Sequence, residues 1–363
     1  MPHPETDGDP IEIAEALIAQ GRAGEAARGL RARLAEGRGG LLSRLTLVRA
    51  LLADHDVAAA LEEARDVALL NPGIAPALLA LGEALLAAEA LPAAIAELQH
   101  ALRIDPDLSR ARLLIAQAWL KAGEADKALE SLRALEPDAE VAAMIAQAQA
   151  IKAAPRSDAG YVRHLFDQFS ADYDSRMTVH LSYAGPQILR DLAAMVMPGR
   201  GGFAILDLGC GTGLAGEAFR PLALRLDGVD LSPAMIAKAR AKNIYDTLMV
   251  ADLETALAAH GPDYDLIIAA DTLVYLGDLG AVFAGARARL APDGFFLFTT
   301  EAKEGEGFEL GPKRRWRHSD SYLRATAERA GLSVAGLVAA TPRHEANQPV
   351  AGFAVALTLP EPR

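Results

Sequence analysis

The sequence ILDLGCGTG at residues 205–213 decides how the second half of the chain folds. Its first four residues form a short apolar run around Asp207, which is typical of a parallel strand covered on both faces. Three glycines follow at alternate positions, and because glycine has no Cβ, the backbone there approaches a ligand closely and reaches positive φ. The helix that we expect to begin near Leu214 points its unpaired N–H groups into the same space. The stretch therefore predicts a strand, a turn and a helix that hold a nucleotide-like ligand against the main chain.

Two kinds of ligand fit this turn. Residues 211–216, GTGLAG, also match the glycine spacing of dinucleotide-binding proteins, so NAD is one alternative. Against NAD, Asp207 precedes the turn by two residues, where a carboxylate repels a pyrophosphate and attracts an ammonium or sulfonium group. No Tyr-x-x-x-Lys pair for hydride transfer follows the turn. With Asp207 included, the stretch resembles motif I, Asp-x-Gly-x-Gly-x-Gly, of the class I S-adenosylmethionine-dependent methyltransferases.

The resemblance implies S-adenosylmethionine as the cofactor. The cofactor-binding positions that it implies at the turn are Asp207, Gly209, Cys210, Gly211 and Gly213. Cys210 is the only cysteine of the chain, which rules out an internal disulfide framework and suits a reducing cytoplasm. We expect it to be a small packing residue, because a nucleophilic cysteine needs a base beside it.

Asp230 ends the second predicted strand, at residues 224–230. It lies about 20 residues after Gly209, where a carboxylate accepts two charge-assisted hydrogen bonds from a ribose diol. The next residue, Leu231, belongs to the same cofactor set. A helix N-cap is the alternative role for Asp230, although Ser232 fills that role better because Pro233 follows it.

Asp252 and Asp271 follow the next two predicted strands, at residues 247–250 and 264–269. Asp252 resembles the acid that accepts from the adenine amino group, with the N–H of Leu253 facing a ring nitrogen. A helix N-cap is the alternative for Asp252. The segment that begins at Asp271 lines the methionine end of the cofactor and the substrate mouth in the proteins that this chain resembles.

Strands and helices alternate through the rest of this half. Further strands are predicted at residues 295–300, 332–338 and 350–359, and helices at 187–197, 234–242, 253–259, 279–290 and 322–330. The alternation predicts a doubly wound parallel sheet. The connection between the last two strands is too short for a helical crossover, so we expect that pair to be antiparallel. The resemblance implies a Rossmann-like seven-stranded methyltransferase sheet with an antiparallel last strand.

An aromatic segment precedes this core. Residues 161–174, YVRHLFDQFSADYD, resemble the helix that folds over the cofactor in many small-molecule methyltransferases. By that resemblance Tyr173 covers the sulfonium, since an aromatic face attracts a cation by about 0.5–2 kcal/mol. The alternative is an apolar stripe of Phe166, Phe169 and Tyr173 that packs on the sheet.

Residues 305–319 are the expected substrate region, because related proteins vary their substrate contacts after the fifth strand. KRRWRH at residues 313–318 gathers four cations around one Trp, which fits a carboxylate or phosphate on the acceptor, with a solvated basic loop as the alternative. His318 and Tyr322 are the candidate catalytic residues, acting as a base if the acceptor arrives protonated, and a structural role is the alternative for His318. The candidate substrate-binding residues are Tyr183, Tyr275, Arg315, Arg317 and Arg343.

The first half of the chain contains an internal sequence repeat. Asn71-Pro72 recurs as Asp105-Pro106, within text that is rich in Ala and Leu and has helical periodicity. This spacing of about 34 residues resembles the helix–turn–helix period of the tetratricopeptide repeat. Gly21 and Gly123 mark the turns of the first and last repeats. We expect four repeats near residues 7–40, 41–74, 75–108 and 109–142.

These patterns divide the chain into a repeat domain at residues 1–150, a linker at 151–160 and a methyltransferase domain at 161–363. The net charge of −12 is concentrated in the first 150 residues, which hold 14 Lys and Arg against 23 Asp and Glu. An acidic protein is a poor binder of nucleic acid and of anionic membranes. The start of the chain lacks a signal-peptide pattern and no run reaches the roughly 20 apolar residues of a membrane span, so we expect a cytoplasmic protein without a metal site.

The expected function is methyl transfer from S-adenosylmethionine to an O, N or C nucleophile of a small-molecule acceptor. The whole chain resembles bacterial proteins in which tetratricopeptide repeats precede a class I core. The repeats are expected to bind a protein partner, basic or neutral in charge, or to form a homodimer, with docking on the catalytic domain as the alternative. Two other functions stay open: a methyltransferase for a protein or carrier-bound substrate that the repeats recruit, and a non-catalytic module that binds the cofactor.

Overall fold

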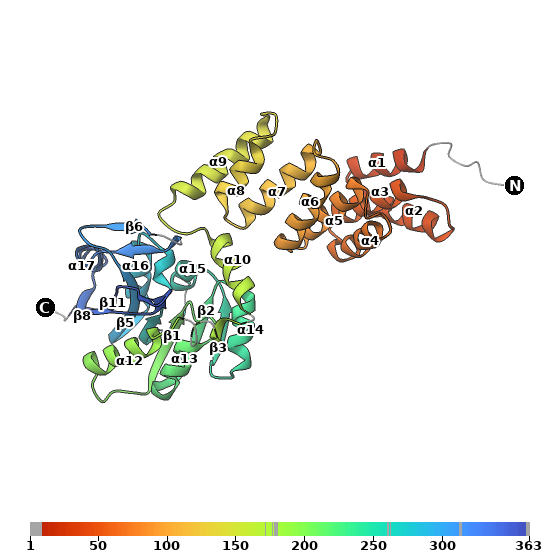
Figure 1. The fold of residues 1–363 in the computed structure, drawn as a ribbon. Helices are drawn as coiled ribbons and strands as arrows, with labels where there is room; N and C mark the ends of the chain where they lie inside the picture. The colour runs from red at the N-terminus through yellow and green to blue at the C-terminus, as the bar shows by residue number, and fades with distance from the viewer. Residues whose placement is uncertain are drawn as a thin grey trace. The chain divides into compact units, whose positions relative to one another are not determined.

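The computed structural model describes residues 9–170, 172–175, 177, 181–259, 261, 263–311 and 314–360. The chain divides into two compact units, one that ends at Lys152 and one that begins at Ala153 (Figure 1). Within the stretch 151–160, the last helix of the first unit runs to Ala153, and Arg156 forms a β-bridge with Leu276. That stretch is therefore structured at both of its ends. In the described part of the chain, no helix is both long enough and apolar enough to span a membrane.

The first unit is a series of helix pairs. Its helices are α1 (Pro10–Ala19), α2 (Ala23–Ala35), α3 (Leu41–Ala53), α4 (Val57–Leu70), α5 (Ala75–Ala87), α6 (Leu91–Ile104), α7 (Ser109–Lys121), α8 (Ala125–Leu132) and α9 (Ala139–Ala153). From α1 to α8, each helix packs on the next, and α1, α3, α5 and α7 also pack on one another in sequence. Helical pairs are therefore stacked along the unit, with the first helices of successive pairs side by side.

The turns within these pairs repeat the period of the sequence. A residue with left-handed backbone recurs once in each pair, at Gly21 (φ 75°), His55 (φ 61°), Glu89 (φ 56°) and Gly123 (φ 65°). The N–H of the residue after each one donates to a carbonyl five residues back, at 2.8–2.9 Å, as Arg22 does to Leu17. This bond satisfies a carbonyl that the helix end leaves free. The turns expected at Gly21 and Gly123 are present, and two non-glycine residues occupy the equivalent positions.

Small residues let the helices of a pair approach closely. Ala26, Ala60, Ala94 and Ala128, which recur with the same period, are at most 2% exposed. Gly82 of α5 shows the same constraint, because a Cβ there would lie 2.5 Å from Leu98 of α6. A larger side chain at such a position would separate the two helices.

The second unit is built on a mixed sheet. Its main strands are β1 (Phe203–Leu208), β2 (Ala223–Asp230), β3 (Thr247–Val250), β4 (Tyr264–Ala269), β5 (Leu290–Ala302), β8 (Ser333–Ala340) and β11 (Gly352–Thr358). Their order is β3-β2-β1-β4-β5-β11-β8, and β1 to β5 are parallel. The last strand, β11, lies between β5 and β8 and is antiparallel to both, which confirms the expected antiparallel pair.

Helices cover both faces of this sheet (Figure 1). One apolar core lies between the strands and α12 (Gly185–Val196) and α13 (Leu214–Phe219). The other lies beneath α15 (Leu253–Ala258), α16 (Gly280–Arg289) and α17 (Asp320–Arg329). A further helix, α14 (Pro233–Ala241), packs on β2 and β3. Two covered faces explain why the strands are continuous apolar runs rather than alternating patterns.

Two segments differ from their predicted form. Residues 305–319 contain the strands β6 (Phe308–Leu310) and β7 (Trp316–His318), which pair with each other, and β7 also extends the sheet beside the end of β5. The helix expected over residues 161–174 is two helices, α10 (Ala159–Phe169) and α11 (Tyr173–Ser175). A small hairpin, β9 (His344–Glu345) with β10 (Gln348–Pro349), precedes β11. Lys313, the first cation of the expected basic loop, lies outside the described residues.

Candidate active site

The glycine turn joins the ends of β1 and β2. The N–H groups of Gly209 and Cys210 both donate to the carbonyl of Val229, at 2.8 and 2.9 Å. Gly209 has φ +68°, and a Cβ there would collide with the side chain of Thr272. Both the backbone conformation and the close approach therefore require glycine at this position.

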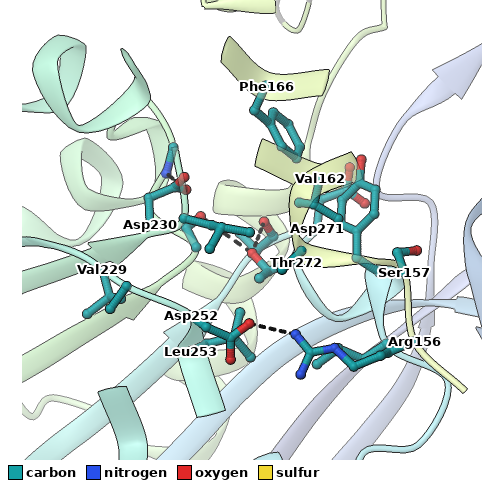
Figure 2. Close-up of a pocket in the computed structure, with 18 of the residues that line it drawn as sticks. Arg156, Ser157, Val162, Phe166, Val229, Asp230, Asp252, Leu253, Asp271 and Thr272 are labelled. Carbon is teal, nitrogen blue, oxygen red and sulfur yellow. Dashed lines mark hydrogen bonds and ion pairs between the residues drawn. The ribbon is translucent and has the colours of Figure 1, made fainter. Parts of the chain in front are cut away.

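A pocket of about 700 Å³ lies at the carboxyl ends of β1, β2, β3 and β4, which is where open α/β sheets bind their ligands (Figure 2). Gly209 and Gly211 line it after β1, and Asp230 lines it at the end of β2. Asp252 and Asp271 line it after β3 and β4. Three carboxylates from three strand ends therefore converge on one apolar pocket.

Asp230 is held by the backbone. Its Oδ2 accepts from the N–H of Gly211 and its Oδ1 from the N–H of Ser232, both at 2.8 Å. Burial raises the pKa of Asp230, and these two hydrogen bonds partly offset that effect. A carboxylate has about four lone-pair sites, so its backbone hydrogen bonds leave acceptor capacity for a diol. Ser232 caps α14 by accepting from Met235, so the N-cap role belongs to Ser232.

Asp252 has two roles at once. Its Oδ1 accepts from the N–H of Glu254 at 3.0 Å and so caps α15, as the alternative interpretation expected. Its Oδ2 lies 2.6 Å from Nη2 of Arg156 (Figure 2). The other amino group of Arg156 reaches Glu254 at 2.9 Å. Leu231 and Leu253 line the same pocket. Arg156 therefore ties the segment before α10 to the β3 end of the pocket.

Three aromatic rings form the side of the pocket away from the strands. Phe166 of α10 meets Tyr173 edge-on with 6.0 Å between ring centres, and meets Tyr275 in the same way at 5.5 Å. All three line the pocket. Burial raises the pKa of Tyr173 and of Tyr275, so both hydroxyls stay protonated. Neutral aromatic rings next to acidic groups make a favourable environment for a cation.

Not every residue of the glycine motif faces this pocket. Asp207 is fully buried, and its Oδ2 accepts from the Tyr245 hydroxyl at 2.7 Å. Alternation along β1 places Asp207 on the same face as Phe203 and Ile205, against α12 and α13. Burial raises the pKa of Asp207 to about 7, which the hydrogen bond from Tyr245 opposes. The expectation that Asp207 faces a cationic ligand directly is corrected, because it supports the turn from behind.

Cys210 and Gly213 also do not line the pocket. Cys210 is 5% exposed, and burial raises the pKa of its thiol, so it is the packing residue that the sequence suggested. Gly213 has φ +96° and caps the start of α13. Of the five motif positions, Gly209 and Gly211 line the pocket in the described structure.

Asp271 belongs to a buried cluster of charges. It has φ +58°, its N–H donates to Thr299 Oγ1 at 2.8 Å, and its Oδ1 lies 2.5 Å from Nη1 of Arg343. Arg343 is completely buried and also pairs with Glu301 and, at 3.0 Å, with Glu345. Burial raises the pKa of Asp271, while the arginines act in the opposite direction. Arg343 therefore positions Asp271 and has no surface of its own for a substrate.

The two candidate catalytic residues have structural roles. His318 is completely buried, and its Nε2 lies 3.1 Å from the carbonyl of Gly277 and its Nδ1 2.6 Å from Thr300 Oγ1. Burial lowers the pKa of His318 to about 4. The Tyr322 hydroxyl accepts from the N–H of Leu279 at 2.8 Å and donates to Asp278 at 3.0 Å. Neither residue lines the pocket, so the geometry argues against a general base at these positions.

The expected substrate-binding residues separate into two groups. Tyr275 and Arg315 line a second cavity that adjoins the pocket. Arg317 lines a different cavity and faces Glu301 at 3.5 Å, while Tyr183 packs over Gly185 near Asp271. The described arginines of the expected basic loop are engaged within the protein, since Arg314 lies over the ring of Tyr161, Arg315 pairs with Glu345 at 2.5 Å and Arg317 faces Glu301.

Several residues that line the pocket could not be identified from the sequence. Arg156 and Ser157 come from a stretch that resembles a linker, and they reach the site because Ser157 and Pro155 form backbone hydrogen bonds with Tyr275 and Gly277. Thr272 fixes the turn from β4, with its hydroxyl 3.1 Å from the carbonyl of Leu208. Such pairings between distant parts of the chain leave no periodic pattern in a single sequence.

Residues 206–296 match the family model described as a methyltransferase domain. The matched range runs from β1 into β5 and contains the glycine turn and the three acidic strand ends. The α/β unit therefore contains a methyltransferase domain.

Two curated relatives illustrate the similarity. Over 92 residues the chain is 39% identical to methyltransferase-like protein 27 of Homo sapiens, a match that covers 25% of this chain and 37% of that protein. Over 121 residues it is 34% identical to the malonyl-[acyl-carrier protein] O-methyltransferase of Yersinia pestis, covering 33% of this chain and 43% of that protein. The chain thus spans less than half the length of each of these relatives. Among solved structures, the magnesium protoporphyrin IX methyltransferase of Synechocystis PCC 6803 with bound SAH aligns with a TM-score of 0.44 and 18% identity, covering 56% of this chain and 100% of that chain.

Proposed function

We propose that the chain transfers a methyl group from S-adenosylmethionine to an O, N or C nucleophile of a small-molecule acceptor. The observation that carries this proposal is the pocket of about 700 Å³ with Asp230 and Asp252 at successive strand ends and three aromatic rings opposite them. The match of residues 206–296 to a methyltransferase domain supports it.

The residues present fit this cofactor. Asp230 has lone pairs free for the ribose hydroxyls, and Asp252 with the N–H of Leu253 faces the place of the adenine. Tyr173 and Phe166 supply ring faces for the sulfonium. When bound, S-adenosylmethionine supplies an electrophilic methyl group attached to positive sulfur. The match to a methyltransferase domain and the three aromatic rings beside the carboxylates favour this cofactor over NAD, whose ribose a carboxylate at the end of β2 would suit equally well.

The protein's own contribution is alignment and exclusion of water. α10 and α11 lie over the pocket and carry two of its aromatic residues (Figure 2). Tyr275 and Asp271 stand where the pocket meets the adjoining cavity, so they border the place at which an acceptor reaches the methyl group. Fixing both reactants in this geometry lowers the barrier without a dedicated base.

We also propose that the helical unit is a tetratricopeptide-repeat array that binds a protein partner or a second copy of the chain. Four helix pairs that share one sequence period, each with a left-handed residue at the same place in its turn, support this assignment. A groove along α3, α5 and α7 supports the binding role. Arg49, Arg110 and Lys121 line this groove with one acid, Glu83, so its lining does not favour the basic partner that the overall composition suggested.

The test uses the full chain and S-adenosylmethionine with a tritiated methyl group, offered with a panel of phenols, amines and activated carbon acids. We expect labelled product and an equal amount of S-adenosylhomocysteine. Asp230→Asn should lower kcat/KM for S-adenosylmethionine about 10–100-fold, because a charge-assisted hydrogen bond is worth about 1.5–3 kcal/mol. The matched control is Asp191→Asn on the exposed side of α12, which should have no effect. Equal transfer by Asp230→Asn and the unchanged protein would contradict the proposed role of Asp230.

A further inference from the structure

A second cavity, which is open to solvent, adjoins the cofactor pocket. Phe166, Tyr173, Asp271 and Tyr275 line both spaces, so the two spaces meet at these four side chains. If the proposed function holds, the second cavity is where the acceptor binds. Its chemistry therefore restricts the acceptor.

Most of this cavity is apolar. Beyond the shared residues, its described lining includes Leu165, Phe169, Met177, Leu181 and Ala346. Arg315 and Glu345 are the charged residues that join Asp271 in that described lining. The apolar wall stabilises a ligand by burying its apolar surface, and the charged corner decides what else the ligand carries.

The charged corner is already paired. Nη1 of Arg315 lies 2.5 Å from Oε1 of Glu345 and 3.8 Å from Glu301. Arg343, behind it, pairs with the same two glutamates and with Asp271. Each of these arginines is therefore in contact with carboxylates of the protein.

The cluster is also neutral as a whole. Arg315, Arg317 and Arg343 face Asp271, Glu301 and Glu345, so three positive charges meet three negative charges. The Arg315 and Glu345 side chains are 20% and 21% exposed, which limits screening by water. An anionic ligand would add a fourth negative charge and would have to separate Arg315 from Glu345.

We propose that Glu345 is a specificity-determining residue, which occupies Arg315 and makes the acceptor site select neutral, apolar molecules over carboxylates and phosphates. The β9–β10 hairpin places Glu345 at this corner, so the selectivity is built from the end of the chain rather than from the cofactor-binding strands. This reverses the expectation that the arginines of residues 314–317 capture an anionic acceptor.

The test compares two phenols of nearly equal size that differ in one group. The neutral one is 4-propylphenol, and the other, 3-(4-hydroxyphenyl)propanoate, carries a carboxylate. Each is titrated by calorimetry, at neutral pH, into the full chain saturated with S-adenosylhomocysteine. We expect 4-propylphenol to bind about tenfold more tightly, because the carboxylate finds no unpaired cation among the described residues of the cavity.

Glu345→Gln should then tighten binding of the carboxylate about tenfold, since Arg315 loses the nearer of its two carboxylate partners, and should change binding of 4-propylphenol less than about twofold. Glu345→Asp keeps the charge and should keep the preference for the neutral phenol. Glu309→Gln, which removes an exposed carboxylate from the neighbouring strand β6, is the matched control and should change neither affinity.

Binding of S-adenosylhomocysteine in the same titrations tests the proposed function separately. A protein that binds it but prefers the carboxylate, or binds neither phenol, overturns the inference and leaves the cofactor assignment intact. So does a Glu345→Gln protein whose affinity for the carboxylate is unchanged. If Glu345→Gln does not fold, the affinities of the unchanged protein for the two phenols still test the inference.

Discussion

Arg343 contacts three carboxylates in the interior of the α/β unit. It is completely buried, and its guanidinium contacts Asp271, Glu301 and Glu345. The planar guanidinium suits this arrangement because it presents several donors in fixed directions. Removing it would leave the carboxylates buried without their main partner, which is far less favourable than the intact cluster.

Arg343→Met should therefore lower the free energy of unfolding by about 3–5 kcal/mol, the usual effect of breaking a buried ion pair. Part of the loss should return in mild acid, where Asp271, whose pKa is raised by burial, is protonated. Urea denaturation at neutral and acidic pH measures both effects. Arg324→Met, which breaks the exposed Arg324–Asp320 pair of α17, is the control and should lose less than about 1 kcal/mol. A similar small loss for Arg343→Met would show that the cluster is not a stabilising unit.

His318 makes stability depend on pH. The Gly277 carbonyl accepts from Nε2, so Nδ1 of the neutral ring accepts from Thr300, and burial lowers the pKa of this ring to about 4. The unfolded chain takes up the proton near pH 6.5. As pH falls from about 6.5 to about 4, the unfolded state therefore gains a proton that the folded state does not, and stability is lost.

His318→Gln should remove this dependence, which is worth on the order of 3 kcal/mol. Asp207 acts in the opposite direction, because its raised pKa, about 7, makes stability fall as pH rises from about 4 to 7. The informative quantity is therefore the difference in free energy of unfolding between the unchanged protein and His318→Gln, measured by urea denaturation across pH 4–7.5. If His318 were instead a general base, the difference would be constant with pH and turnover at neutral pH would fall about 10²–10⁴-fold.

At the scale of the elements, the turns between paired helices of the first unit include left-handed backbone positions that are not occupied by glycine. His55 stands where Gly21 and Gly123 stand in other turns, with φ +61° and an exposed side chain. A non-glycine residue in this conformation costs roughly 1–2 kcal/mol. Glycine avoids this cost but loses more conformational entropy on folding, so the net gain from glycine is smaller.

His55→Gly should raise the free energy of unfolding of the first unit by about 0.5–1 kcal/mol. Ala53→Gly, at the exposed last residue of α3, is the matched control and should lower it by about 1 kcal/mol. Thermal unfolding followed by circular dichroism at 222 nm measures both. Destabilisation by both changes to the same extent would refute the assignment of His55 as the turn residue.

Elements with a strong local pattern could be predicted from the sequence. Strands β3 and β4 have the predicted limits, and β11 pairs as expected, because apolar runs and short connections carry this information. The β6–β7 pair could not be predicted, since strands of three residues have no detectable alternation. This affected the predicted role of His318. The residue is buried within β7, whereas in an open loop it would be exposed.

Within the site, residues at strand ends could be predicted and those that depend on tertiary contacts could not. Asp230 and Asp252 line the pocket because the carboxyl end of a parallel strand defines where a ligand binds. The prediction for Asp207 was wrong because its side chain lies on the face of the sheet that α12 covers. The alternation along β1 already implied this. Arg156 and Glu345 act through ion pairs with distant residues, and no local rule identifies such partners.

For the molecule as a whole, the described residues that line the cofactor pocket run from Arg156 to Leu276. Residues 153–363 expressed alone should therefore fold and bind S-adenosylhomocysteine within about threefold of the full chain. Residues 9–152 alone should give an almost purely helical circular dichroism spectrum. Calorimetry of the longer fragment tests the first expectation, and a folded fragment that does not bind would show that the helical unit completes the site.

The pocket at the strand ends is assigned to S-adenosylmethionine rather than to a dinucleotide. Calorimetric titration of the full chain with S-adenosylhomocysteine and, separately, with NAD is the decisive measurement. We predict a single site for S-adenosylhomocysteine and no detectable heat of binding for NAD, because residues 206–296 match a methyltransferase domain and the pocket combines strand-end carboxylates with aromatic rings, which suits a ribose, an adenine and a sulfonium. Tight binding of NAD without binding of S-adenosylhomocysteine would contradict this assignment.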